Sequence, residues 1–306
     1  MRFEAVRAIY ENGLKNNSLW FINGDLGHMK TEEFRRDFGA RYINGGMSEQ
    51  NIIGVSAGLA LSGMQVVAYS IVPFITLRCI EQIKIDICDQ NLNVIVLGVG
   101  GGFAYGSAGA THYSIEELAM LRALPNMKIV CPADPPETYS LMKQVLELGG
   151  PAYVRIGRGK EPNLPVQIPA ALGKASVLRE GGDITIVSQG TIVSEALRAA
   201  EILSAEGLEV EVANMHTLKP IDREFLLDRA GKRRGIFTLE EHSVIGGLGS
   251  AVAEVLMDSD NRPKKFHSFG VDDFWPETVG SQQYLRDVCN ISAEKVAGSI
   301  SRILAA

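Results

Sequence analysis

The chain has 306 residues, enough for two ordinary domains, and its 46% hydrophobic and 22% charged residues are the composition of a globular protein. A formal net charge of −6 gives no reason to expect a nucleic-acid or anionic-membrane partner. We predict a cytoplasmic protein for three reasons. The cysteines are scattered without Cys-x-x-Cys spacing, and the chain starts with a charged helical pattern in place of a signal peptide. In addition, no apolar run approaches the roughly 18 residues of a membrane span.

Short apolar runs rich in β-branched residues alternate with helical patterns from the N-terminus onward. This alternation predicts an α/β fold of mainly parallel sheets covered by helices. A helix is expected over Phe74–Gln90, because Ile80, Ile83 and Ile87 recur at three- and four-residue spacing. Strands are expected at Leu19–Asn23, Val66–Ser70, Val94–Gly98, Lys128–Cys131 and Ala152–Ile156.

A proline-containing polar stretch, Gly157 to Gly173, follows and has the composition of an extended linker. Beyond it, strands are expected at Ile184–Ser188, Val210–Asn214 and Gly235–Leu239, and helices at Ser194–Glu206, Arg223–Ala230, Gly249–Met257 and Ala293–Ile303. We therefore predict a first α/β domain at residues 1–158, a linker at 159–173 and a smaller α/β domain at 174–306.

One carboxylate, that of Glu49, stands immediately before the apolar stretch Ile52–Leu61. A Glu at the head of a buried helix loses hydration, which favours its protonated form unless a partner compensates. Such a group can share a proton with a bound base. The simpler explanation is a carboxylate stabilised by the helix dipole, typically by about 0.3–1 kcal/mol.

The segment around Glu49 resembles the Gly-x-x-Glu-Gln/His segment of the transketolase family. Further segments resemble that family in the family's own order: Gly24–Leu26, Tyr69–Phe74, Leu77–Ile83, Gly109–His112, Leu124–Met127, Thr217–Asp222, and Glu240–His242 with Gly246–Gly249. The resemblance covers nearly the whole chain. It implies a pyrimidine-binding domain followed by a transketolase C-terminal domain.

The cofactor that the resemblance implies is thiamine diphosphate. In the family, the Glu at the position of Glu49 shares a proton with a ring nitrogen of the cofactor's aminopyrimidine. Phe74 is expected to stack on that ring, with Val72 and Ile75 as competing wall residues. Asp25 follows a strand and would face the cofactor, unless it is an ordinary turn or capping residue.

Two histidines are candidate substrate contacts. His112 matches the His of the family's Gly-x-Thr-His segment, which contacts the reacting carbonyl or hydroxyl of the substrate, so we name it with Glu49 as catalytic. His28 could hydrogen-bond a substrate hydroxyl or phosphate, or could be an exposed loop residue. For the remaining histidines, capping or interdomain packing is the expectation: His216, His242 and His267.

Two arginines, Arg78 and Arg158, match positions near the sugar phosphate in related enzymes. The forked guanidinium suits bidentate phosphate binding, and ion pairing to Glu or Asp is the structural alternative. Ala108 stands where the family usually has an Asp that helps to recognise a sugar hydroxyl or the donor, which implies a more apolar site.

The Gly-Asp-Gly…Asn pair that holds Mg²⁺ and the cofactor diphosphate has no match in this sequence. The resemblance therefore implies that the metal ligands lie on a separate N-terminal subunit, in a heterotetramer with two copies of each chain. The expected reaction is transfer of a two-carbon ketol unit from a ketose donor to an aldose acceptor, with sugars or sugar phosphates as substrates. The alternatives are a split 1-deoxy-D-xylulose-5-phosphate synthase, the beta subunit of an α-keto acid dehydrogenase, and a non-catalytic paralogue.

Overall fold

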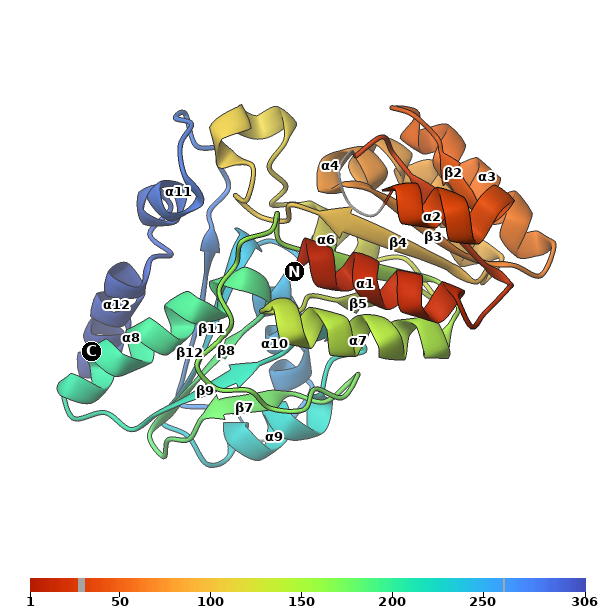
Figure 1. Ribbon diagram of the computed structural model, residues 1–306. Coiled ribbons are helices and arrows are strands. Elements are labelled where there is room, and N and C mark those ends of the chain that lie inside the picture. The colour runs from red at the N-terminus through yellow and green to blue at the C-terminus, as the bar shows by residue number, and fades with distance from the viewer. Residues whose placement is uncertain (27–30, 261) are drawn as a thin grey trace.

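The computed structural model describes residues 1–26, 31–260 and 262–306, and these residues build two sheets of mainly parallel strands with helices on their faces (Figure 1). The larger sheet has the strand order β10-β5-β6-β4-β3-β1-β2. Its strands are β1 (Leu19–Asn23), β2 (Tyr42–Asn44), β3 (Gln65–Ile71), β4 (Val94–Val99), β5 (Lys128–Val130), β6 (Ala152–Ile156) and β10 (Thr217–Lys219). Its neighbouring strands pair in parallel, whereas β10 pairs antiparallel with β5.

Side chains alternate between the two faces of this sheet, as the pleat requires. In β3, Val66 and Ala68 join one hydrophobic cluster while Val67 and Tyr69 join another. One face is covered by α1 (Arg2–Gly13), α2 (Thr31–Phe38) and α7 (Pro135–Leu148), and α1 and α7 lie side by side in Figure 1. The other is covered by α3 (Glu49–Leu61), the segment Val72–Asp89 and α6 (Glu117–Arg122).

The smaller sheet has the order β12-β11-β8-β9-β7, in which β7 pairs antiparallel and the other neighbours pair in parallel. Its strands are β7 (Ser176–Arg179), β8 (Ile184–Ser188), β9 (Val210–Asn214), β11 (Gly235–Ser243) and β12 (Lys265–Val271). The helices of this half are α8 (Val193–Ala205), α9 (Arg223–Ala230), α10 (Leu248–Met257), α11 (Gln282–Val288) and α12 (Ala293–Ala305). The predicted α/β architecture with two mainly parallel sheets is thus confirmed.

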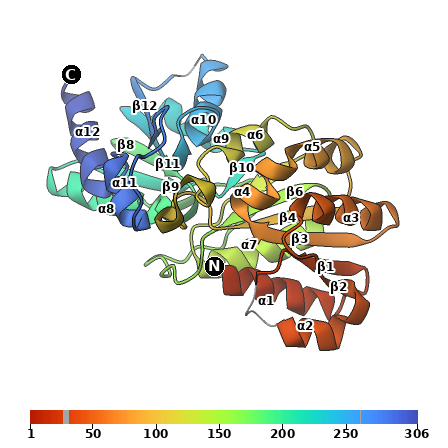
Figure 2. The same ribbon diagram turned by 90° about the horizontal axis from the view of Figure 1, so that it is seen from above.

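The two halves share one hydrophobic core. A single cluster runs from Ile52 of α3 and Leu121 of α6 to Leu226 of α9 and Val252 of α10. In addition, β10 lies beyond the expected linker in sequence but adds to the edge of the larger sheet (Figure 2). The boundaries 1–158, 159–173 and 174–306 stay a prediction, and the packing shows that the halves they delimit are closely joined.

The helix expected over Phe74–Gln90 is not continuous, so this prediction was wrong in detail. The segment divides into α4 (Val72–Ile75), a 3₁₀ turn (Leu77–Cys79), α5 (Ile80–Gln82) and a π-helical stretch (Ile83–Asp89). Thr76 departs from regular helix geometry at φ −110° and ψ −75°, and its hydroxyl donates to the Val72 carbonyl at 2.6 Å. The isoleucine spacing identified the buried face, but it did not reveal the break before Arg78.

No helix within the described residues is both long enough and apolar enough to span a membrane.

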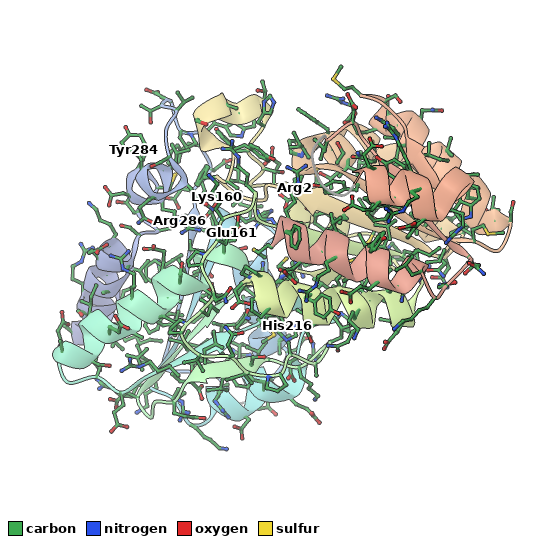
Figure 3. All side chains as sticks on the ribbon, viewed as in Figure 1. Arg2, Lys160, Glu161, His216, Tyr284 and Arg286 are labelled. Carbon is green, nitrogen blue, oxygen red and sulfur yellow. The ribbon has the colours of Figure 1, made fainter. Side chains whose placement is uncertain are left out.

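His216 lies at the junction of the two halves and is labelled in Figure 3. Its carbonyl accepts from the backbone N–H of Cys131 at 2.7 Å, directly before β10 begins. Its ring is fully buried, Nδ1 bonds the Thr217 hydroxyl, and Nε2 has no partner within the described part of the chain. Burial lowers the pKa of His216 to about 4. His216 therefore packs between the halves as an uncharged residue, as expected from the sequence.

We predict that His216 makes the fold sensitive to acid. Because its pKa is lower in the folded chain than in the unfolded chain, its contribution to stability is complete above about pH 6.5 and is lost as the pH falls toward 4. Between pH 7 and 4.5 the loss should be about 2 kcal/mol in the free energy of unfolding. Denaturant unfolding of wild type and His216→Gln at both pH values measures it, and equal losses in the two proteins would contradict the assignment.

Candidate functional site

Glu49 is the first residue of α3 and its side chain is 2% exposed. Its carboxylate is paired, because Ser70 at the end of β3 donates to Oε1 at 2.9 Å and Arg78 Nη1 donates to Oε2 at 2.8 Å. The compensating partners that a buried carboxylate needs are therefore present. Each carboxylate oxygen keeps lone-pair capacity for a further donor.

The end of β1 lies beside Ser70, which bonds Glu49. The amide of Gly24 donates to the Tyr69 carbonyl, and a Cβ at Gly24 would lie 2.7 Å from the Ser70 hydroxyl oxygen, so only glycine fits. Asp25 follows in a left-handed conformation (φ 56°) and accepts from Asn44 Nδ2 at 2.9 Å. Asp25 thus stands at the carboxyl edge of the sheet, one strand from Ser70. The other candidate of this loop, His28, lies outside the described residues.

A row of side chains connects the predicted catalytic and substrate residues. The Arg78 guanidinium lies 4.7 Å from the centroid of the Phe74 ring, and this ring meets the His112 imidazole edge to face at 5.2 Å. The His112 ring centroid is in turn 6.5 Å from that of Tyr105, and the Arg158 guanidinium lies 5.0 Å from the Tyr105 centroid. We call Arg78, Phe74, His112, Tyr105 and Arg158 the aromatic row.

Arg78 is both an ion-pair partner and half exposed, since its side chain keeps 47% of its surface accessible while it bonds Glu49. Arg78 therefore makes the ion pair with a carboxylate that the sequence indicated as the alternative to phosphate binding. Arg158 is exposed at the other end of the aromatic row and bonds no carboxylate among the described residues. Phosphate contact stays a prediction for both.

Tyr105 is a site residue that sequence reasoning missed. The signal is the glycine run 100–102 after β4: Gly100 adopts φ 87°, and a Cβ on it would lie 2.0 Å from the Tyr105 ring. Gly100 therefore has two reasons to be glycine, a left-handed backbone and the ring packed directly on it. The Tyr105 ring is fixed by this contact.

The Cys79 thiol beside Arg78 is not a nucleophile. Burial, together with the nearby charge of Glu49, raises the pKa of Cys79 to about 12, so the thiolate is scarce at neutral pH. Its Sγ contacts the Phe74 carbonyl at 3.3 Å, which is a packing role.

These residues suit a flat, basic, heteroaromatic group. Glu49 offers a buried carboxylate that can share a proton with a ring nitrogen, and the half-buried Phe74 offers a ring for stacking. The Arg78 guanidinium bonds the Glu49 carboxylate and also packs on the Phe74 ring, so the carboxylate and the ring lie on either side of this one group. Within the described residues, no three His, Cys, Asp or Glu side chains gather to hold a metal ion.

Comparison with known families identifies two matches that together span most of the chain. Residues 6–162 match the transketolase pyrimidine-binding domain, and residues 173–296 match the transketolase C-terminal domain.

Two curated relatives and one solved structure point to the same family. The chain is 38% identical over 235 residues to a subunit of the apulose-4-phosphate transketolase of Phocaeicola vulgatus, covering 76% of this chain and 75% of the relative. It is 36% identical over 298 residues to the 6-deoxy-6-sulfo-D-fructose transketolase subunit SqwH of Clostridium sp. strain MSTE9, covering 97% and 92%. A solved split-gene transketolase, described as an inactive beta4 tetramer, superposes with a TM-score of 0.89 at 38% identity over 99% of this chain and 98% of its own.

We predict that Gly100→Ala displaces Tyr105 and disturbs the aromatic row. Gly63 is a matched control, because it has the same φ of 87° with no described atom within 4 Å of its Cβ position. Both alanine variants should lose about 1–2 kcal/mol of stability to backbone strain, and Gly100→Ala should lose more because the ring must move. Thermal unfolding of both measures the difference. Equal losses would show that the ring adjusts freely.

Proposed function

Because this chain belongs to the transketolase family, we propose that it works as one subunit of a two-component, thiamine diphosphate-dependent transketolase that moves a two-carbon ketol unit from a ketose to an aldose. The observation that carries the proposal is Glu49, a buried carboxylate with oriented donors next to an aromatic ring. In the proposed complex the cofactor supplies the electron sink for the reaction.

The residues of this chain would hold and orient the cofactor's aminopyrimidine. Glu49 would share a proton with the ring nitrogen, and Ser70 fixes the direction of its carboxylate through the 2.9 Å bond. Phe74 would stack on the ring, and Asp25 would face it from the end of β1. When the aminopyrimidine binds, the Arg78 side chain would move away from the Glu49 carboxylate or rotate beside it, because this half-exposed side chain can move into solvent.

The substrate would lie along the aromatic row. His112 would contact the reacting oxygen of the sugar, and the exposed guanidinium of Arg158 would bind an anionic group at the far end of the sugar. The names of two relatives support an anionic sugar, since one specifies a sugar phosphate and the other a sulfonated sugar.

A second subunit is expected to supply Mg²⁺ and the ligands of the cofactor diphosphate. Support comes from the relatives named as subunits and from the description of the tetramer of beta chains alone as inactive. Large apolar side chains are exposed around the site, Met47 at 84% before α3 and Val279 at 62% against Gly109, and a partner would cover them. We propose a heterotetramer with two copies of each chain, in the cytoplasm, where the four free cysteines stay reduced.

The test of the function is Glu49→Gln in the complex with the diphosphate-binding partner. The amide keeps the shape but cannot share the proton, so ketol transfer should fall by about 10²–10⁴-fold while assembly is unchanged. Glu224→Gln, an exposed first-turn Glu of α9, is the control. A Glu49→Gln complex that keeps most of its activity would refute the mechanism. Release of CO₂ from pyruvate by the wild-type complex, in place of ketol transfer, would favour the synthase or dehydrogenase alternatives.

Arg158→Ala should raise KM for phosphorylated acceptors more than for unphosphorylated ones. A charge-assisted bond of about 1.5–3 kcal/mol corresponds to roughly 10- to 100-fold in KM. Lys160→Ala, which removes an exposed cation two residues away, is the matched control. The measurement is KM for a pair of acceptors that differ only in the phosphate. Equal losses on both acceptors would place the phosphate elsewhere.

A further inference from the structure

The segment that carries Tyr105, Ala108 and His112 begins and ends at one point. Gly102 and Ser114 exchange both of their backbone hydrogen bonds, at 2.9 and 3.1 Å. We call residues 102–114 the His112 loop. Whatever fixes Gly102, Phe103 and Ser114 therefore fixes the base of the loop, and with it the direction of His112.

The first clamp on this base comes from the larger sheet. Arg155 of β6 donates from Nη2 to the Ser114 carbonyl at 3.1 Å and from Nε to Glu117 at 2.6 Å. The Ser114 hydroxyl donates to the other oxygen of Glu117 at 2.9 Å. Ser114 is thus held on two sides by a buried ion pair.

The second clamp comes from the smaller sheet. Glu241 of β11 is 3% exposed and accepts the backbone N–H of Phe103 on Oε1 at 2.5 Å. A Cβ on Gly102 would lie 2.2 Å from the same oxygen, so the loop backbone rests directly on the carboxylate. The Glu241 carbonyl also accepts from Arg155 Nη2 at 3.0 Å, which ties the two clamps together.

Side chains of α11 hold Glu241 in place. Arg286, labelled in Figure 3, pairs with Oε2 through Nε and also donates to the Thr191 hydroxyl at 3.1 Å. Gln282 donates to Oε1 at 2.8 Å. The Glu241 carboxylate therefore joins the base of the His112 loop to α11.

The same half of the molecule touches the His112 loop further out. Gly106 approaches Leu285 so closely that a Cβ would lie 2.4 Å from its methyl carbon, and Gly280 N donates to the Gly106 carbonyl at 3.4 Å. The loop is therefore packed between the two halves, although its sequence belongs to the first.

We propose that Glu241 is a positioning residue for the active site: it fixes the His112 loop, and thereby the substrate wall, from the C-terminal half. This inference rests on the proposed function for its kinetic part only. It gives the C-terminal half a part in substrate binding.

The experiment is Glu241→Gln in the complex with the diphosphate-binding partner, with Glu211→Gln as matched control. Glu211 is also a fully buried strand carboxylate of the smaller sheet, and its bonds within the described residues go to Thr185, Arg229 and Arg233, away from the loop. Both variants lose a buried ion-pair partner, so both should lower the unfolding temperature. Only Glu241→Gln should raise KM, by about tenfold or more, with a smaller change in kcat, because misplacement near 1 Å can cost up to about 10²-fold.

Hydrogen exchange of the isolated chain supplies a readout that does not depend on the reaction. In Glu241→Gln the amides of residues 103–113 should exchange faster than in wild type, and in Glu211→Gln they should not. If Glu241→Gln does not fold, Gln282→Ala removes the side-chain amide that donates to both oxygens of the carboxylate, and it should give the same pattern more weakly. Equal KM values for the Glu241 and Glu211 variants, or unchanged exchange in the loop, would overturn the proposal. If the loop of the isolated Glu241→Gln chain exchanges faster but the wild-type complex shows no ketol transfer, the proposed function is refuted and the positioning role of Glu241 stands.

Discussion

The buried guanidinium of Arg155 is the constraint on which the arrangement of the two halves depends. Removing an ion from water costs several kcal/mol, and a close ion pair with further hydrogen bonds is needed to offset this cost. Here Nε bonds Glu117 while Nη2 bonds the carbonyls of Ser114 and Glu241. These acceptors come from α6, from the loop after β4 and from the smaller sheet. Moving the halves apart would take the Glu241 carbonyl away from Nη2, while the ion pair with Glu117 would stay within the first half. The cost of leaving this buried donor without its acceptor adds to the shared hydrophobic core that joins the halves.

The site follows from the parallel order of the larger sheet. Parallel register brings the carboxyl ends of neighbouring strands to one edge, where open α/β sheets bind their ligands. Ser70 of β3 pairs in register with Gly98 of β4, and Gly98 pairs with Arg155 of β6. The connections that follow β1, β2, β3, β4 and β6 therefore lie at this edge, and they contribute Asp25, Glu49, Phe74, His112 and Arg158 in turn. No single connection contains the site.

Much of this could be predicted from the sequence, and the failures have a common cause. The buried central strands Leu19–Asn23, Ala152–Ile156, Ile184–Ser188 and Val210–Asn214 match the expected bounds, because a continuous apolar run identifies a buried strand. The unpredicted strands β2, β7, β10 and β12 are short, lie at sheet edges or expose part of their length, so they lack that pattern. The roles of Ser70, Tyr105 and Glu241 depend on contacts between distant segments. Local periodicity carries no information about such contacts.

The replacement of the family's usual Asp by Ala108 gains a physical meaning from the geometry of the loop. Tyr105 and Ala108 are joined by a 3₁₀-type bond from Ala108 N to the Tyr105 carbonyl at 2.8 Å, and residues three apart in such a turn lie on the same side. We infer that a carboxylate at position 108 would lie on the side of the Tyr105 ring and could pair with the Arg158 guanidinium that packs on this ring. With alanine there, Arg158 rests on the aromatic face and keeps its hydrogen-bond donors available for an anion. In the proposed enzyme, alanine at position 108 would therefore weaken recognition of a sugar hydroxyl and favour binding of an anionic group, and both effects would arise from one side chain.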